Sequence, residues 1–356
     1  MVILLFCLAF ASIAFSTGRA QSAKPLVCNG MAELCDLRLD QVTLPGTHNS
    51  GSGFNGHLYH WGGGLAGSHF FRNQQWNFTH QLDYGIRYFD IDTCYVGKGN
   101  GDWWKEGAWT CHMGPAGAAF AGPVRQLLNQ IRNWMEKPEH RNEVIVIKFG
   151  RDVEESKNRK NIYEDILKTL KDFNWKPTQA TLHKKSLTTN AEFGKNYKWP
   201  TLRSAIESNQ RVFVFMSEKL LEHEDPAEFH NNRWIVVAEA QVKITWPEIL
   251  VWGKDCSEVV PNTEKNCEKF KNSGLLELDV FGSSMLFSTW EMQSSCDTYM
   301  QEAMDKCFAK RKPFHRTVNA VIADWVNRSK APNSVLAVAH KQNLKNIAMF
   351  RNNGRK

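Results

Sequence analysis

Several patterns that mark common classes of protein are missing from this 356-residue chain. Its cysteines include no Cys-x-x-Cys pair, which argues against a zinc site. No basic cluster with interleaved aromatic residues occurs, which argues against nucleic acid as a partner. Neither an internal repeat nor a break in composition divides the chain, so we expect a single folded domain.

Long apolar runs are also missing beyond the first twenty residues. Val2 to Phe15 form an apolar run that is too short to cross a bilayer comfortably, and small and polar residues follow it up to Ala20. This pattern predicts a secretory signal peptide over residues 1–20, with cleavage near Gly18-Arg-Ala20, and a secreted domain over residues 21–356. No Lys or Arg precedes the run, and the alternative is an uncleaved signal anchor.

Eight cysteines follow Cys7, which itself lies in the expected signal peptide. An even number suits disulfide bonds in an oxidising compartment. The sequence leaves the connectivity open, and our expectation is that nearest neighbours along the chain pair, which would join Cys94 to Cys111. Asn77-Phe-Thr79 and Asn327-Arg-Ser329 are acceptor motifs for N-glycosylation if they are exposed.

A histidine follows the first short strand-like run of the chain. Val42 to Leu44 predict a strand that ends at Pro45-Gly46, because these two residues stop a strand and let the backbone turn sharply. His48 and Asn49 would then lie at the carboxyl end of this strand. Alone, such a histidine is more often a solvated side chain than a catalytic one.

Two further segments repeat this arrangement. Gly85-Ile-Arg-Tyr-Phe-Asp-Ile-Asp92 predicts a second strand, whose period of two places Asp90 and Asp92 on one face. Ala108-Trp-Thr-Cys-His-Met-Gly114 predicts a third, with His112 close before a glycine. Two histidines and two acids at the ends of successive strands would form an acid–base site with room for a hard cation.

The remainder of the chain alternates between helix-like and strand-like segments. Apolar residues recur at three- and four-residue steps from Ala116 to Glu136, which predicts an amphipathic helix. The other predicted elements are strands at Glu143–Phe149, Arg211–Met216, Trp234–Ala238 and Val318–Trp325, and helices at Tyr163–Phe173 and Val335–Phe350. This alternation is typical of an α/β fold with a parallel sheet and crossover helices. The segment from Cys256 to Cys307 is polar and has no predicted helix or strand.

These motifs resemble the X domain of phosphatidylinositol-specific phospholipases C. The resemblance rests on Pro45-Gly-Thr-His-Asn-Ser50, on Gly85-Ile-Arg87 with the two acids that follow, and on His112 near a glycine, in that order and at similar spacing. It is specific from about Leu39 to Asp152 and weaker in the later strands. It implies a single-domain α/β fold, a distorted TIM-type (β/α) barrel, with the site at the carboxyl ends of its strands.

The resemblance also implies a reaction, the cleavage of an inositol phospholipid by a phosphodiesterase. His48 would be the base that takes the proton of the inositol 2-hydroxyl, and His112 would be the acid that protonates the diacylglycerol leaving group. The products would be diacylglycerol and a (cyclic) inositol phosphate. Asp324 loosely matches a family acid that orients the first histidine.

A calcium ion is the cofactor that the resemblance implies. Asn49 and Asp92, with Asp90 two residues earlier, are similar to the calcium-dependent branch of the family, so we expect these three residues to bind Ca²⁺. A further glutamate of that branch falls at Phe149 or Gly150, where no side chain can bind a metal. Asp152 or water would replace it, or Arg151 would supply positive charge to the phosphate directly.

The expected partners are a phospholipid membrane surface and an inositol phospholipid, which a net charge of +7 also suits. Trp103 and Trp104, in a glycine-rich loop, are predicted to form a membrane rim, and packing beneath the loop is an equal alternative. Arg87 is a candidate substrate contact, and its pairing with a barrel carboxylate is the favoured alternative. We expect a monomer that binds no nucleic acid.

Other functions remain open from the sequence. A glycosylphosphatidylinositol-cleaving enzyme, or a phosphodiesterase for another lipid, would use similar chemistry. A catalytically inactive barrel that binds a lipid headgroup is the competing class. The presence of both histidines argues against that class, because binding a headgroup needs no acid–base pair.

Overall fold

The computed structural model describes residues 25–56, 59–60, 72–97, 105–114, 117–153, 158–173, 199–216, 220, 235–239, 242–244, 256–271, 275–284, 289–311, 317–329 and 332–353. The expected signal peptide over residues 1–20 and the pair Trp103 and Trp104 lie outside these residues. None of the described helices is both long and apolar enough to cross a membrane.

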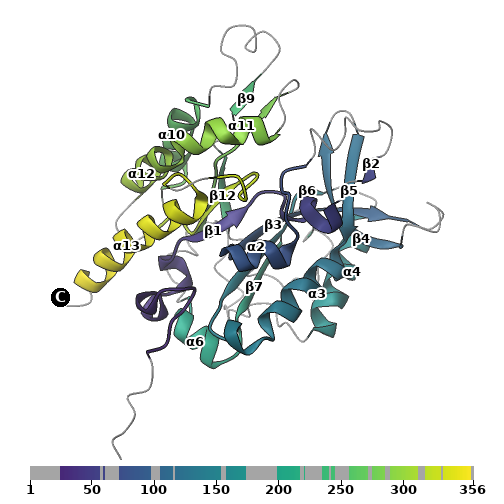
Figure 1. The fold of residues 1–356 in the computed structure, drawn as a ribbon, viewed down its shortest axis with the longest axis horizontal. Coiled ribbons are helices and arrows are strands. Elements are labelled where there is room, and N and C mark those ends of the chain that lie inside the picture. The colour runs from purple at the N-terminus through teal and green to yellow at the C-terminus, as the bar shows by residue number, and fades with distance from the viewer. Residues whose placement is uncertain are drawn as a thin grey trace, which may run out of the picture.

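Seven parallel strands form the centre of the fold (Figure 1). Their order is β8 (Ile235–Glu239), β10 (Leu275–Asp279), β12 (Ala320–Ala323), β1 (Leu44–Thr47), β3 (Tyr88–Val96), β6 (Ile145–Val153) and β7 (Val212–Met216). Starting at β1 and passing from β7 to β8, this is also the order of the chain, as in a (β/α) barrel. No pairing joins β7 to β8 among the described residues. The α/β barrel-type fold predicted from the sequence is confirmed.

Strands β3, β6, β7, β10 and β12 separate two apolar cores, because successive side chains point to opposite faces. In β6, Ile145 and Ile147 belong to the outer core, whereas Val146 belongs to the inner one. The outer core includes buried residues of α2 (Phe78–Tyr84), α3 (Val124–Met135) and α4 (Arg159–Asp172). In Figure 1, α3 and α4 lie on one flank of the strands, and the group of α10, α11 and α12 lies on another.

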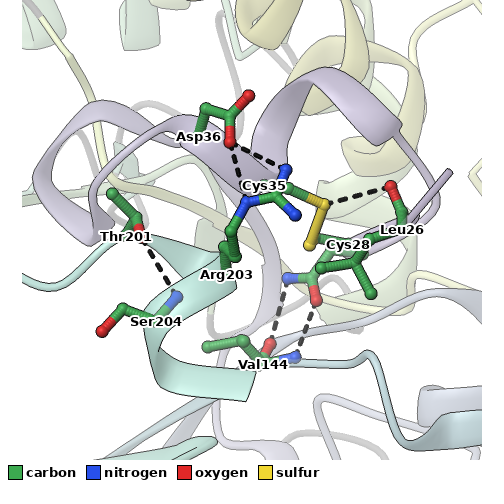
Figure 2. Close-up of a disulfide and its surroundings, with 9 residues drawn as sticks. Leu26, Cys28, Cys35, Asp36, Val144, Thr201, Arg203 and Ser204 are labelled. Carbon is green, nitrogen blue, oxygen red and sulfur yellow. Dashed lines mark hydrogen bonds and ion pairs between the residues drawn. A yellow bond between two sulfur atoms is a disulfide. The ribbon is translucent and has the colours of Figure 1, made fainter. Parts of the chain in front are cut away.

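The segment before β1 packs against the inner core. It contains two 3₁₀ helices, η1 (Ala32–Asp36) and η2 (Leu39–Gln41). Figure 2 shows the Cys28–Cys35 disulfide in this segment, with Asp36 bound to Arg203 of α6 (Leu202–Glu207) at 2.9 Å. The Asn29 amide also exchanges two hydrogen bonds with the backbone of Val144.

Strand β1 passes through Pro45-Gly46, which corrects the expectation that the strand ends there. Pro45 lies just before the pairing of β1 with β3 begins at Gly46 and Tyr88, so its missing N–H removes no bond from that ladder. Gly46 is needed for packing, since a Cβ atom there would lie 2.7 Å from Cγ2 of Ile322 on β12. The strand therefore ends at Thr47, directly before His48.

An antiparallel extension grows from the second half of β3. There β3 pairs with β4 (Gly107–Gly114), β4 pairs with β5 (Gly117–Pro123), and β5 pairs with β2 (Tyr59–His60). The prediction of a helix from residue 116 is therefore wrong for its first part. Residues 117–123 are a strand because they find a partner in β4, and the helix starts only after Pro123. Figure 1 shows β4 and β5 projecting beyond the parallel strands.

A helical layer follows β8. It contains α10 (Val259–Lys269), α11 (Thr289–Cys296), the 3₁₀ helix η6 (Asp297–Tyr299) and α12 (Met300–Lys310), and its buried apolar residues belong to the outer core. The final helix α13 (Val335–Asn353) contacts α12, β1 and β12. Within the polar segment from Cys256 to Cys307, for which no element was predicted, residues 275–279 form β10, a full member of the parallel sheet.

The disulfides in this layer differ from nearest-neighbour pairing. Cys28–Cys35 and Cys94–Cys111 are as expected, but Cys256 bonds to Cys296 and Cys267 to Cys307. Cys256 lies just before α10 and Cys267 lies near its end. A helix of that length separates its ends by about 16 Å, whereas a disulfide needs Cα atoms closer than about 7 Å. Each of these cysteines therefore bonds to the neighbouring helical segment.

Candidate functional site

His48 is the first residue after β1 and is almost fully buried. Its Nδ1 lies 2.8 Å from Oδ1 of Asp324, which follows β12, the neighbour of β1 in the sheet. The ring also stacks on Phe281, with 3.9 Å between ring centroids and an interplanar angle of 8°. A carboxylate on Nδ1 and an aromatic ring on one face fix the orientation of the imidazole. When Nδ1 carries its proton toward this carboxylate, Nε2 is the ring nitrogen that carries the lone pair.

The turn after His48 is held by buried polar contacts. Asn49 adopts a left-handed backbone conformation with φ of 44°, which asparagine tolerates better than most residues. Thr47 Oγ1 lies 2.7 Å from Ser50 Oγ, and Thr47 also donates a hydrogen bond to Gln81 of α2. The chain therefore reverses within a few residues and keeps Asn49 buried beside the end of β1.

His112 reaches the same region from the antiparallel extension. It lies on β4, next to Cys111, whose disulfide to Cys94 joins β4 to β3. The ring centroids of His112 and His48 are 6.3 Å apart, with an interplanar angle of 81°. Two imidazoles at this separation can contact one phosphate group from two sides. The structure therefore brings together the two histidines that the sequence singled out.

Asp90 and Asp92 lie on β3 and are completely buried. Phe89 and Ile91, which alternate with them, belong to the outer core, so the two acids point into the barrel. The predicted placement of Asp90 and Asp92 on one strand face is confirmed.

Lys148 forms a buried ionic cluster with acids from two other strands. Its Nζ lies 3.0 Å from Oδ1 of Asp90 and 2.5 Å from Oε1 of Glu277 on β10. Tyr88 donates a hydrogen bond to the other oxygen of Glu277. Burial alone would lower the pKa of Lys148, but Asp90, Glu277 and Asp279 outweigh it, and the pKa is raised above its ordinary value. Lys148 is thus a permanent cation inside the barrel.

The fit of this site to calcium depends on Asn49, Asp90 and Asp92. All three offer the hard oxygen atoms that Ca²⁺ prefers, and all three are buried, Asn49 just after β1 and the two acids on the neighbouring strand β3. The ammonium group of Lys148 already neutralises part of the charge on Asp90. In the described ranges, no three His, Cys, Asp or Glu side chains converge in a way that would hold a metal ion. The donor chemistry suits calcium, and Lys148 competes with it at Asp90.

Arg87 is a correction to the predicted site. Its Nε donates to Oε2 of Glu143 at 2.8 Å, and its Nη1 donates to the backbone oxygens of Leu82 and Ile86. It immediately precedes β3 and, by the alternation of the strand, faces away from Asp90. It therefore pairs with a carboxylate, as the favoured alternative predicted, on the side of the sheet opposite Asp90. The backbone of Arg151 belongs to β6, and its side chain lies outside the described residues.

Several residues at the site have no assignment from the sequence. Glu277 and Asp279 stand at the end of an apolar run with a spacing of two, the same signal that identified Asp90 and Asp92, so this pair could have been recognised. Lys148 interrupts an otherwise apolar strand, which is also a detectable signal. Asn73 and Gln74 belong to a segment without helix or strand periodicity, and no pattern in the sequence marks them.

Comparison with protein families identifies relatives of this chain. The family described as PI-PLC X 1 matches residues 34–337. The PI-PLC X domain-containing protein 1 of Arthroderma benhamiae is 30% identical over 203 residues, which are 56% of this chain and 53% of that protein. An uncharacterized protein of Mycobacterium tuberculosis is 31% identical over 130 residues, 35% of this chain and 24% of that protein. The chain thus spans about half the length of the first relative and about a quarter of the second.

Solved structures with a similar fold include phosphatidylinositol-specific phospholipase C from Staphylococcus aureus. One variant of that enzyme has a TM-score of 0.51 at 12% identity, covering 87% of this chain and 96% of its own. A second variant has a TM-score of 0.51 at 15% identity, covering 86% and 92%. At these identities, the similarity concerns the fold.

Proposed function

Because this chain belongs to the PI-PLC X family, we propose that it is a secreted phosphodiesterase that cleaves an inositol phospholipid at a membrane surface. In this proposal, His48 is the general base and His112 is the general acid. The family and the fold support phospholipase C chemistry in general. The particular residues, the cofactor and the products are our assignment.

The observation that carries this proposal is the pair of histidines. His48 and His112 come from strands that are distant in sequence, and their ring centroids lie 6.3 Å apart. Nδ1 of His48 lies 2.8 Å from the carboxylate of Asp324, and this contact fixes the orientation and the tautomer of the ring that we assign as the base. An acid–base reaction on one phosphate needs such a pair, whereas simple binding of a headgroup does not.

The proposed reaction is an intramolecular displacement. His48 Nε2 takes the proton of the inositol 2-hydroxyl, whose oxygen then attacks phosphorus. The bond from phosphorus to the glycerol oxygen breaks, and His112 gives a proton to that oxygen. Diacylglycerol leaves, and a cyclic inositol phosphate remains, which water can open. General acid–base catalysis of this kind contributes roughly 10²–10⁴-fold to the rate.

Positive charge near the phosphate is the second requirement. We propose that Asn49, Asp90 and Asp92 bind Ca²⁺, which would supply that charge when bound. Arg151, which follows Gly150 on β6, is the alternative source of positive charge.

The location and the surface also belong to the proposal. Four disulfides support an oxidising compartment, and we propose that residues 1–20 direct secretion. We further propose N-linked glycans at Asn77 and Asn327, a membrane rim at Trp103 and Trp104, and a monomeric state.

The test is release of inositol phosphate from phosphatidylinositol vesicles, with calcium and with a chelator. His48→Ala and His112→Ala should each lower kcat by about 100-fold or more. His80→Ala is the matched control, because His80 is exposed on α2, and it should retain the wild-type rate. Loss of activity in chelator would support calcium, whereas activity unaffected by chelator would favour Arg151.

Other outcomes would overturn the assignment. Full activity in His48→Ala would exclude that residue as the base. Binding to the vesicles without release of product would favour a headgroup-binding barrel. Release from glycosylphosphatidylinositol or another lipid, but not from phosphatidylinositol, would keep the chemistry and change the substrate.

A further inference from the structure

We propose that Asn73 is a positioning residue that orients the side chains of both His48 and Asn49. One amide side chain holds the acid behind the base and also holds the neighbouring amide that is proposed to face the cation. This inference rests on the proposed function, because it assigns a role within that site. No motif in the sequence pointed to Asn73.

The contacts of Asn73 form a continuous buried chain of hydrogen bonds. Its Nδ2 donates to Oδ2 of Asp324 at 3.0 Å, and the other oxygen of Asp324 lies 2.8 Å from Nδ1 of His48. Its Oδ1 accepts a hydrogen bond from Nδ2 of Asn49 at 3.0 Å. All four side chains are at least nine-tenths buried, so water is a poor substitute for any of these bonds.

The side chain of Asn73 must donate to a carboxylate and accept from an amide at the same time. An amide does both, because its nitrogen carries two protons and its oxygen carries two lone pairs. Aspartate could accept from Asn49 but could not donate to Asp324 when ionised. Leucine has a similar shape and can do neither. The position therefore selects an amide by its chemistry as well as by its size.

The backbone of this segment fixes the amide in place. The N–H of Asn73 donates to Oγ of Ser52 at 3.1 Å, and its carbonyl oxygen accepts from the N–H of Trp325 at 2.6 Å. The next side chain, Gln74, donates to the backbone oxygens of His48 and Ala323 at 3.0 and 2.8 Å. The segment thus bridges the carboxyl ends of β1 and β12, which carry the base and its acid.

Close packing also holds the segment against the turn after His48. A Cβ atom at Gly53, in the 3₁₀ helix η3 (Ser50–Gly56), would lie 2.1 Å from the carbonyl oxygen of Trp76. Only glycine allows this approach of two backbones. Asn73 therefore has little freedom to move away from Asp324 and Asn49.

The bond to Asn49 has a consequence for the proposed cation site. Since Nδ2 of Asn49 is committed to Asn73, the oxygen of the same amide is turned to the other side. Asn73 thus decides which atom of Asn49 is presented as a possible ligand. The same residue that orients the base therefore also orients the amide oxygen beside it.

The test compares three variants of the full chain. Asn73→Leu removes both hydrogen bonds at similar volume, and Asn73→Asp keeps the bond from Asn49 but loses the bond to Asp324. Gln75→Ala is the matched control, because Gln75 lies in the same segment, is exposed, and accepts a hydrogen bond from Asn327. We would measure kcat and KM on phosphatidylinositol vesicles, thermal unfolding, and the ¹H–¹⁵N signal of His48 Nδ1–H, assigned by its loss in His48→Ala.

We expect kcat to fall about 10- to 100-fold in both Asn73 variants, with KM changed less than about twofold, as for other groups that orient a reacting residue. The His48 Nδ1–H signal should shift or broaden in both, and Gln75→Ala should match the wild type in every readout. Asn73→Asp, which has nearly the native size, keeps the test informative if Asn73→Leu does not fold.

Two outcomes would overturn the inference. Wild-type kcat and an unshifted His48 signal in Asn73→Asp would show that Asn73 only fills space. A lower unfolding temperature with an unshifted His48 signal would assign Asn73 to the fold alone. If the wild type releases no inositol phosphate, the proposed function fails, and the His48 signal still decides whether Asn73 positions that ring.

Discussion

At the scale of single residues, we expect removal of the Lys148 side chain to lower the free energy of unfolding strongly. Lys148→Met leaves Asp90 and Glu277 buried without their shared cation. Breaking a buried ion pair from one side costs about 3–5 kcal/mol, and we expect the free energy of unfolding to fall by that amount in urea titrations. Lys271→Met is the control, because Lys271 pairs with Glu268 at the surface and such pairs contribute at most about 1 kcal/mol.

The same urea titrations can be repeated in the presence of Ca²⁺. If Asp90 can bind the ion, Ca²⁺ should stabilise Lys148→Met more than it stabilises the wild type, because the ion takes the place of the lost ammonium group. Equal stability of Lys148→Met and the wild type would contradict the role of Lys148 as an internal cation.

Residue-scale prediction from the sequence succeeded where a strand gave the side chains a direction. Asp90 and Asp92 were placed on one face by the period of the strand, and His48 was placed at the end of another. It failed for Asn73 and Phe281, because both reach the site from connecting segments. A local pattern carries no information about which distant strand end such a segment will meet.

At the scale of elements, the disulfides of the helical layer give a direct prediction. Peptide mapping without reduction should find Cys256 joined to Cys296 and Cys267 joined to Cys307. A map with Cys256 joined to Cys267 would contradict the arrangement of α10 beside α12.

Each disulfide should stabilise the protein more, the longer the loop that it closes. The Cys267–Cys307 bond spans 40 residues and the Cys28–Cys35 bond spans seven. In the chain-entropy description, these loops contribute about 4 and about 2.4 kcal/mol. Replacing both cysteines of the longer loop by serine should therefore lower the free energy of unfolding more than the same change in the shorter loop. The reverse order would contradict this expectation.

The elements that the sequence misassigned share one cause. Residues 117–123 were assigned to the following helix, and residues 275–279 to no element, yet both are strands with partners far away in sequence or across a turn. Pairing with another strand decided their state, and local propensity did not. Helices α4 and α13, in contrast, were predicted close to their observed bounds, because helical periodicity is a local property.

At the scale of the whole molecule, the barrel and the helical layer share one core. Met304 on α12 is fully buried in the same cluster as Ile147 of β6 and Val321 of β12. We therefore expect Met304→Ala to lower the free energy of unfolding of the whole domain by about 2–5 kcal/mol. Near-ultraviolet and far-ultraviolet circular dichroism should give coincident transitions before and after the change.

The control for this prediction lies on the same helix. Lys306 is exposed, and Lys306→Ala should leave the unfolding curves in near- and far-ultraviolet circular dichroism unchanged. Two separate transitions, of which Met304→Ala moves only one, would show that the helical layer unfolds by itself.

The order of the parallel strands could be predicted from the sequence, whereas the antiparallel extension could not. The alternation of strands and helices, together with the family resemblance, predicted a (β/α) barrel, and the parallel sheet follows the chain order. The strand that carries His112 was predicted, whereas its antiparallel pairing with β5 was not. Only three-dimensional pairing separates a barrel strand from a hairpin built on one.

The register of strand β3 decides which of its side chains face the interior of the barrel. Its even-numbered residues Tyr88, Asp90 and Asp92 face the interior, and Phe89 and Ile91 face the helices. Insertion or deletion of one residue early in this strand would exchange the two sets, burying acids among the helices and apolar rings beside the histidines. Natural variation in length should therefore be confined to the loops on either side, while the count of residues from Gly85 to Asp92 is inherited intact.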